Sequence, residues 1–422
     1  MPTRTKALGG KVDLGPFFAS LVLSLIGVLL IYSSGKLEFS EAYQNLYKKQ
    51  ILWLIIALIV SYPVMKVSIK SLSGLSYFLY TASVMLLVIV LALPGSGPHR
   101  WIRLGSIQIQ PSEIAKLLTI LALARYLGRK RQRLERLTDF LLPLIIAGVP
   151  AFLILIEPDL GTAFVFIPIL FAMLFWSGAR PLYLLFLASP LLSLTFSSLS
   201  LIAHSHAIIY TILFALFFIL LVIVILLRKP YFFDALIIIA MNIAVGLLYK
   251  PLWNHLEAYQ KKRLLAFLGL DSDPLGIDWQ RIQSQVAIGS GGFWGKGFLE
   301  GTQKKLAFLP EQHTDFIFSI VGEEMGFIGV FIILLLYYFL LSRSLYIART
   351  APTPFSSSVS MGIAALIFTH VFVNITMVTG YLPVIGLPVP FLSYGGSSLV
   401  MFFVAIWLLE RMSLEKTHIW LR

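Results

Sequence analysis

A single acidic residue stands where a polar stretch of the sequence meets a long apolar one. Asp315 ends the polar sequence LPEQHTD, which includes Glu311 and His313, and the apolar run after it continues to Leu341. An ionisable group at the mouth of a membrane helix is costly to place, so it suggests a function. A carboxylate there can act as a general base on a hydroxyl group. Thr314 and Asp315 could equally cap the helix, because a helix N-terminus favours a side-chain acceptor and a negative charge.

Two more stretches place charged residues between apolar segments. In RWIRLGSIQIQPSEIAK, Pro111 suits the first turn of a helix, and Glu113 and Lys116 are three residues apart, on one helix face. The pair could be only a helix-end salt bridge. The sequence EPDLGT contributes Glu157 and Asp159, which could be a turn residue and a helix cap.

These residues favour chemistry on a lipid that carries phosphate. Basic groups at the depth of lipid headgroups suit anionic lipids, and a carboxylate beside them can serve as a base. The combination fits a transferase, and it fits a lipid transporter equally well. The carboxylates are Glu113, Glu157, Asp159, Glu311 and Asp315, and the cations are Arg100, Arg103, Lys116, Lys304 and Lys305.

The composition is that of a membrane protein. The chain has 422 residues, of which 58% are hydrophobic and 13% charged, and its mean hydropathy is +0.87. Soluble proteins have about 25% charged residues. The net charge of +13 needs no nucleic-acid partner, because membrane proteins concentrate Lys and Arg in cytoplasmic loops. The absence of cysteine excludes disulfides, thiol chemistry and cysteine-bound metals.

The hydrophobic segments predict an all-α polytopic protein whose residues 1–422 form one integral-membrane domain. Twelve segments are long enough to span a bilayer. Their distribution of Lys and Arg places both termini in the cytoplasm and residues 251–314 in a large loop outside. The segments are 15–35, 50–66, 72–94, 111–128, 139–156, 160–178, 181–202, 207–227, 231–250, 315–342, 355–379 and 388–410.

The large loop contains a glycine-rich cluster, GSGGFWGKG, at residues 289–297. The cluster is not a P-loop, because Ser290 and Gly297 occupy positions where that pattern needs glycine and a hydroxyl residue. We therefore expect no nucleotide there. Residues 283–288 could form an amphipathic helix on the membrane surface.

The last outer stretch, Thr379–Ser398, holds three prolines and a Gly395–Gly396 pair. Irregular backbone at membrane depth is tolerated only where protein or a cavity covers it. We predict an interrupted segment that faces an internal cavity. A helix start kinked by proline is the alternative.

Five blocks resemble, in order, the signature blocks of the SEDS family (shape, elongation, division and sporulation). They are RWIRLGSIQIQPSEIAK, EPDLGTA, YQKKR with DSDPLG, the stretch from Gln283 to Phe327, and LPVIGLPVPFLSYGGSS. The last block is similar to RodA-like members, which act in cell elongation. Family members typically have ten spans, so the resemblance implies a ten-helix core plus an extra helical pair within residues 181–250.

The resemblance implies a peptidoglycan glycosyltransferase in the bacterial inner membrane. Its substrate would be lipid II, which carries undecaprenyl pyrophosphate, and its partner a class B penicillin-binding protein that crosslinks the product. Asp315 matches the essential acidic residue and would take a proton from the acceptor sugar. A divalent cation, Mg or Mn, could bridge the pyrophosphate. The matched substrate-binding positions are Arg100, Trp101, Arg103, Glu113, Lys116, Lys304 and Lys305, and the supporting ones are Glu157, Asp159, Glu311, His313 and Ser393.

A lipid II flippase without chemistry is the alternative. Transporters concentrate ionisable groups near the bilayer midplane and often contain internal repeats. This sequence has few charges within its spans and no repeat between its first nine and last three segments. A scaffold that only recruits a penicillin-binding protein is a third hypothesis, in which Asp315 would be replaceable.

Overall fold

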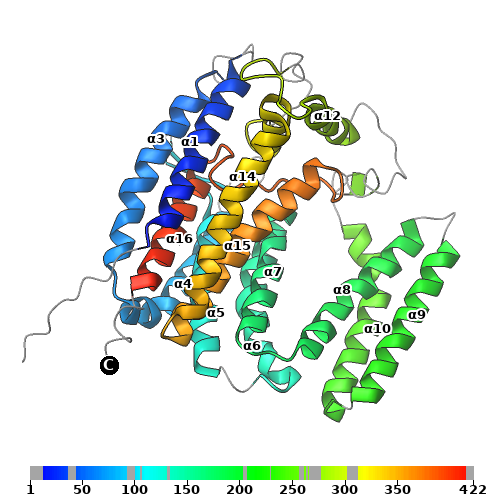
Figure 1. Ribbon diagram of the computed structural model, residues 1–422. Helices are drawn as coiled ribbons and strands as arrows, with labels where there is room; N and C mark the ends of the chain where they lie inside the picture. Colours follow the sequence, from blue (N-terminus) through cyan, green and yellow to red (C-terminus); the bar gives the residue numbers. More distant parts are fainter. Residues whose placement is uncertain are drawn as a thin grey trace, which may run out of the picture. The chain divides into compact units, whose positions relative to one another are not determined.

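The computed structural model describes residues 13–36, 44–92, 100–104, 107–130, 134–202, 207–228, 230–255, 261–262, 265, 277–301 and 312–414. These residues are almost all helical (Figure 1). They form two compact units, and each is described by itself. Unit 1 comprises residues 1–131, 143–177 and 280–422, and unit 2 comprises residues 132–142 and 178–279.

Ten helices of the described residues are long and apolar enough to cross a membrane. Helices suit a bilayer because all their main-chain hydrogen bonds lie within the segment. The helices of unit 1 are α1 (Gly15–Gly35), α3 (Leu46–Ser61) with the 3-10 helix η1 (Tyr62–Lys66), α4 (Ile69–Ala92), α5 (Pro111–Lys130), α6 (Leu141–Ile156), α7 (Leu160–Trp176), α14 (Ile317–Thr350), α15 (Pro354–Val378) and α16 (Gly396–Leu414). The helix α12 (Ile277–Ser290) precedes α14, and a short antiparallel hairpin of β1 (Ile102–Leu104) and β2 (Ile107–Ile109) precedes α5.

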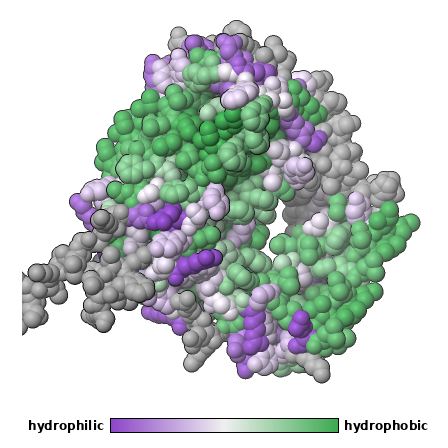
Figure 2. Space-filling view, in the orientation of Figure 1, coloured by the Kyte–Doolittle hydropathy of each residue, from purple (hydrophilic) through white to green (hydrophobic). Residues whose placement is uncertain are grey.

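Helix α15 is the centre of unit 1. It packs against α14, α5, α7 and α16, and most of its residues are buried. Small residues such as Ser356, Ser360 and Gly362 line this buried helix, and small residues let neighbouring helices approach closely in membranes. On the face of unit 1 drawn in Figure 2, hydrophobic side chains form a belt, with hydrophilic residues gathered above and below it.

Helix α14 is broken near its start. Gly326 has φ +61° and ψ −161°, which interrupts the helical hydrogen bonds. The turn 291–297 replaces them: the amides of Lys296 and Gly297 donate to the carbonyls of Glu323 and Glu324, at 3.0 and 3.1 Å. Lys296 Nζ also lies 2.9 Å from Glu323 Oε1. The glycine-rich turn 291–297 therefore binds the main chain of α14 at its break.

The described part of unit 2 includes the 3-10 helix η2 (Leu137–Phe140) and the long helices α8 (Pro181–Ile202), α9 (Ala207–Arg228) and α10 (Phe232–His255), and α8 packs against both α9 and α10. Asn242 of α10 donates to Ser189 Oγ at 2.8 Å and accepts from Ser193 Oγ at 2.6 Å. Paired polar groups of this kind hold membrane helices together.

Each of the twelve predicted spans coincides with a helix, although α5 is too polar and α7 too short to be among the ten apolar ones. Two predicted boundaries are wrong. The last helix begins at Gly396 rather than at residue 388, because the residues before it form irregular backbone. Helix α14 begins at Ile317 with Phe316 as its N-cap, so neither Thr314 nor Asp315 is the cap. The assignment of residues 1–422 to one membrane domain, with a loop at 251–314, stays a prediction.

Candidate active site

The segment that carries Asp315 is a series of turns, residues 312–316, held by its main chain. Asn374 Nδ2 donates to the carbonyl of Asp315 at 2.7 Å, and Ser393 Oγ donates to the carbonyl of Thr314 at 2.6 Å. The amide of Tyr394 donates to the carbonyl of His313 at 2.8 Å. The Asp315 side chain is half-buried. Its backbone is thus fixed while its carboxylate retains access.

Two segments form the walls of the site: the turns 312–316 and the irregular segment 384–395. The proline-rich sequence predicts the irregular backbone of the second segment. Gly386 has φ +71°, and a Cβ added to it would lie 3.1 Å from Asp315 Oδ2. The carboxylate therefore lies directly against this glycine. The segment is held within itself by Ser393, whose Oγ accepts from the amide of Val389 at 2.8 Å. It is held from α15 by Asn374, which donates to the carbonyl of Leu387 at 2.7 Å.

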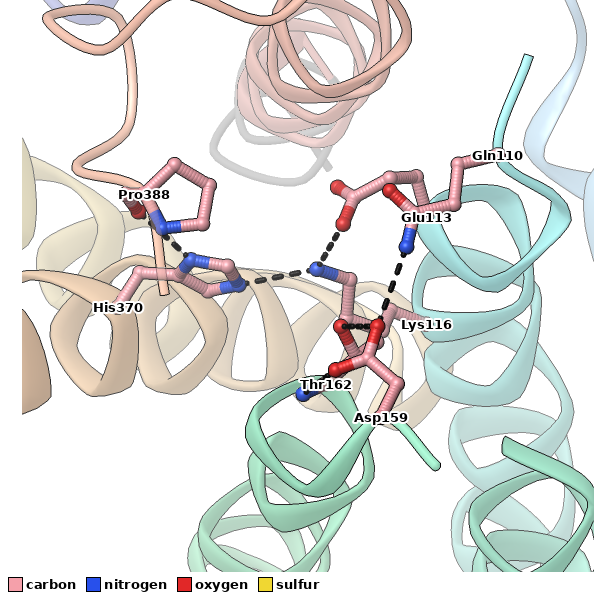
Figure 3. A network of polar contacts seen from close by, with 7 residues as sticks. All are labelled: Gln110, Glu113, Lys116, Asp159, Thr162, His370 and Pro388. Atoms are coloured by element: carbon pink, nitrogen blue, oxygen red, sulfur yellow. Dashed lines mark hydrogen bonds and ion pairs between the residues drawn. The ribbon is translucent and has the colours of Figure 1, made fainter. Parts of the chain in front are cut away.

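A buried charged network lies between α5 and α15 (Figure 3). Lys116 Nζ is 2.7 Å from Glu113 Oε1 and 3.0 Å from His370 Nε2, and Lys116 has no exposed surface. His370 Nδ1 lies 3.0 Å from the carbonyl of Pro388. Because a carbonyl only accepts, Nδ1 carries the proton and Nε2 accepts from the Lys116 ammonium. This network thus connects α5 to the segment 384–395.

The start of α7 brings a third element to the segment. Asp159 caps α7 by accepting from the amide of Thr162 at 3.1 Å and from its hydroxyl at 3.0 Å. Gln110 Nε2 donates to Asp159 Oδ2 at 3.3 Å. A Cβ on Gly161 would lie 2.4 Å from the carbonyl oxygen of Ile385, so only glycine permits this contact. The cap that EPDLGT predicts is confirmed, and it sets α7 against the wall of the site.

Glu157 and Arg100 form the edge of this region. Arg100 Nε donates to the carbonyl of Glu157 at 2.8 Å, and its Nη2 donates to the carbonyl of Pro158. The Glu157 carboxylate is buried, and neither oxygen has a hydrogen-bond partner among the described residues. Burial, followed by the charge of Asp159, raises the pKa of Glu157 to about 7, although Arg100 opposes the shift.

Two of the other predicted site residues, Trp101 and His313, have described side chains. Trp101 is 41% exposed beside the hairpin, and the His313 ring lies 5.7 Å from that of Tyr394. The Arg103 main chain pairs with Gln108 in the hairpin, but its side chain is outside the described part. Lys304, Lys305 and Glu311 also lie outside the described residues.

Sequence reasoning missed two residues of this site, His370 and Asn374. Both lie within an apolar span, one helical turn apart, and both are fully buried. Polar residues inside membrane spans are costly, which was the available signal. Apart from Lys116, their partners are main-chain carbonyls of segments far away in the sequence, and a carbonyl gives no residue-type signal that could identify the pairing.

The described residues contain no group of three His, Asp or Glu side chains placed to hold a metal ion. Mg²⁺ is commonly held by one or two carboxylates together with substrate phosphates. Asp315 can supply one carboxylate in that mode. A site made of protein ligands alone does not fit the residues described.

Comparisons with known proteins identify the family. The FtsW/RodA/SpoVE family model, described as cell cycle protein, matches residues 15–208 and 188–418. The chain is 33% identical to the peptidoglycan glycosyltransferase MrdB of Escherichia coli K12, over 94% of this chain and 92% of that protein. It is 36% identical to the peptidoglycan glycosyltransferase RodA of Treponema pallidum, over 92% of this chain and 94% of that protein.

Solved structures agree. A chain from a study of how a peptidoglycan synthase complex coordinates polymerization and crosslinking matches with a TM-score of 0.69 at 26% identity, covering 96% of this chain and 99% of that one. The rod shape determining protein RodA of Thermus thermophilus matches with a TM-score of 0.61 at 26% identity, covering 95% and 96%. The matches extend over nearly the whole of each chain, and the two segments of the family model together include every helix described above; this protein therefore belongs to the FtsW/RodA/SpoVE family of multi-pass membrane proteins.

Proposed function

We propose that this protein is a peptidoglycan glycosyltransferase that polymerises lipid II for cell elongation. The observation that carries the proposal is the similarity, along almost the full length, to relatives named peptidoglycan glycosyltransferase. The site adds a carboxylate, Asp315, on a backbone fixed by three hydrogen bonds to neighbouring carbonyls.

In the proposed reaction, Asp315 is the general base. It takes the proton from a hydroxyl of the acceptor sugar as the oxygen forms a bond to C1 of the donor sugar. The bond between C1 and the phosphate oxygen breaks, and undecaprenyl pyrophosphate leaves with the bonding electrons. The rigid segments 312–316 and 384–395 hold the base in place, which lowers the entropic cost of reaching the transition state.

The cations stabilise the charge that develops on the pyrophosphate. We assign Arg100, whose guanidinium donates to the carbonyls of Glu157 and Pro158 just before α7, to this role together with Arg103, Lys304 and Lys305. Lys116 has no exposed surface, so it acts through its position and charge within the buried network. A divalent cation, Mg or Mn, would supply further charge neutralisation if Asp315 and the phosphates held it together.

The partners and the topology complete the proposal. The donor and acceptor are lipid II, and the crosslinking partner is a class B penicillin-binding protein. The resemblance to a chain of a peptidoglycan synthase complex supports that pairing. Both termini lie in the cytoplasm, so that Asp315 faces the outer side of the inner membrane.

One observation favours a lipid II transporter as the second candidate. Glu113, Lys116 and His370 are ionisable residues buried between helices, and such residues also mark transport pathways. Two assays separate the candidates. Purified protein, with and without its partner, is given labelled lipid II, and glycan polymer is measured beside lipid scrambling in vesicles. Polymer is the expected product; scrambling without polymer under both conditions would instead establish the transporter.

A further inference from the structure

Two buried side chains of α15 hold both walls of the candidate site. Asn374 and His370 lie four residues apart, which places them on one face of the helix. Asn374 Nδ2 donates one hydrogen to the carbonyl of Asp315 and the other to that of Leu387, each at 2.7 Å. His370 Nδ1 donates to the carbonyl of the next residue, Pro388, at 3.0 Å.

The orientation of Asn374 follows from its partners. Both partners are carbonyl oxygens, which can only accept, so the amide nitrogen and not the oxygen faces them. The amide oxygen, Oδ1, is buried and has no partner among the described atoms. Leaving a buried acceptor unsatisfied costs stability. The unsatisfied oxygen of Asn374 therefore lowers the stability of the fold, while its amide nitrogen bridges two segments that are far apart in the sequence.

We infer that Asn374 is a positioning residue for Asp315, and that His370 extends this hold to Lys116 on α5. The inference rests on the proposed role of Asp315 as the base. Asn374 fixes the carbonyl of the residue that carries the carboxylate, and it fixes the carbonyl beside Gly386, against which the carboxylate lies. Asn374 thus joins the two segments at the residue that carries the base, while Ser393 and Tyr394 join them at the carbonyls of Thr314 and His313.

The test replaces Asn374 and measures kcat and KM for lipid II polymerisation, with thermal stability measured in detergent. Asn374→Asp removes the donor and sets a carboxylate against two carbonyls. Asn374→Gln keeps the donor but moves it by one methylene. A displacement of about 1 Å costs about 100-fold in rate when geometry limits a reaction. We expect kcat to fall about 10- to 100-fold for Asn374→Asp, and less for Asn374→Gln, with KM unchanged.

Thr369→Val is the matched control. Thr369 is buried on the same helix, and its hydroxyl donates at 2.7 Å to the carbonyl of Ala365 within α15. Its replacement removes a buried polar group without touching either wall, so kcat should be preserved. A folded Asn374→Asp protein with wild-type kcat overturns the inference; if that variant does not fold, wild-type kcat in Asn374→Gln overturns it.

Two substitutions at His370 separate its two contacts. The Asn amide nitrogen can take the place of Nδ1 and keep the bond to Pro388, whereas the Gln amide oxygen can take the place of Nε2 and accept from Lys116. We expect His370→Asn to keep more of kcat than His370→Gln, because the bond to Pro388 is the one that holds the wall. The reverse order contradicts this.

Asp315→Ala, assayed in parallel, separates the proposed role of Asp315 as the base from the positioning role of Asn374. If Asp315→Ala still polymerises lipid II normally, the proposed base is wrong. If Asp315→Ala is inactive while the Asn374 variants are normal, only the positioning role is wrong.

Discussion

At the level of single residues, the site combines the half-buried carboxylate of Asp315 with the buried charged side chains of Glu113 and Lys116. Lys116 and Glu113 are both buried, and such a pair costs desolvation energy unless its geometry satisfies both groups. Here His370 takes a further hydrogen bond from Lys116, whereas Glu113 Oε2 is buried without a hydrogen-bond partner among the described residues. Removing one partner of a buried pair leaves an uncompensated charge, with a typical cost of about 3–5 kcal/mol. The network is therefore a structural support for the two segments around Asp315.

Glu157 makes the stability of the folded protein depend on pH. Its pKa is raised from 4.5 to about 7, chiefly by burial, so folding favours its protonated form. Its contribution to stability is fully present below about pH 4.5 and is lost as the pH rises through about 7. We expect Glu157→Gln to melt at a higher temperature than wild type at pH 8, and the difference to vanish at pH 4.5.

Thermal unfolding in detergent at both pH values measures this effect. Glu135→Gln removes an acidic group from an exposed side chain and controls for the change in net charge. A melting-temperature difference between Glu157→Gln and wild type that is the same at both pH values would show that the buried carboxylate is not responsible.

At the level of helices and strands, apolar length predicted ten of the twelve spans among the described residues, because a span needs about 20 apolar residues. Helix α5 is more polar and α7 is shorter than this rule requires. The start of α16 could not be predicted in this way, because Pro388 and Pro390 lie in an apolar sequence but in irregular backbone. That backbone is stabilised by side chains of α15, and sequence patterns do not reveal such distant pairings. For the same reason the break in α14 at Gly326 could not be predicted: the groups that replace its lost hydrogen bonds belong to the turn 291–297.

Gly326→Ala tests whether the contact between the turn 291–297 and the break in α14 is needed for stability and activity. A Cβ there would lie 2.2 Å from the amide nitrogen of Gly295, and φ +61° is strained for alanine. Strain of this kind costs about 1–3 kcal/mol, and displacement of the turn adds to it. We expect a lower melting temperature and a loss of polymerising activity, because the turns that carry Asp315 lead directly into the broken end of α14.

Gly289→Ala is the control for this change, since no atom lies within 4 Å of a Cβ at that position. Alanine in a helix is about 0.5–1 kcal/mol more stable than glycine, so this variant should be neutral or slightly stabilised. Equal destabilisation by both substitutions would show that the conformation and contacts of Gly326 have no special role in stability.

At the scale of the whole molecule, the family model matches in two stretches that overlap at residues 188–208, within α8 and the start of α9. The overlap lies inside the region where the sequence predicts an extra helical pair. An inserted pair returns the chain to the same side of the membrane, so the elements after it keep their orientation. The described residues of the site all lie in unit 1. Within unit 2, Asn242 and Asp234 make polar contacts that join α10 to α8.

The orientation of the termini is directly testable, because the chain has no cysteine and any introduced thiol is unique. We expect a membrane-impermeant maleimide to label Ser290→Cys, but not Thr350→Cys, in spheroplasts. Both side chains are exposed, at the end of α12 and at the end of α14. Labelling should reverse in inverted vesicles; the opposite pattern would place the large loop in the cytoplasm.

The role of Asp315 as the base is tested by polymerisation of purified lipid II by wild type, Asp315→Asn and Asp315→Ala, with the partner present and with folding confirmed by thermal unfolding. Asp315→Asn is nearly the same shape but cannot accept the proton at neutral pH. We expect glycan polymer from wild type and none from either variant, with melting temperatures close to that of wild type. Near-normal polymer from a folded Asp315→Asn protein would contradict the assignment of Asp315 as the base.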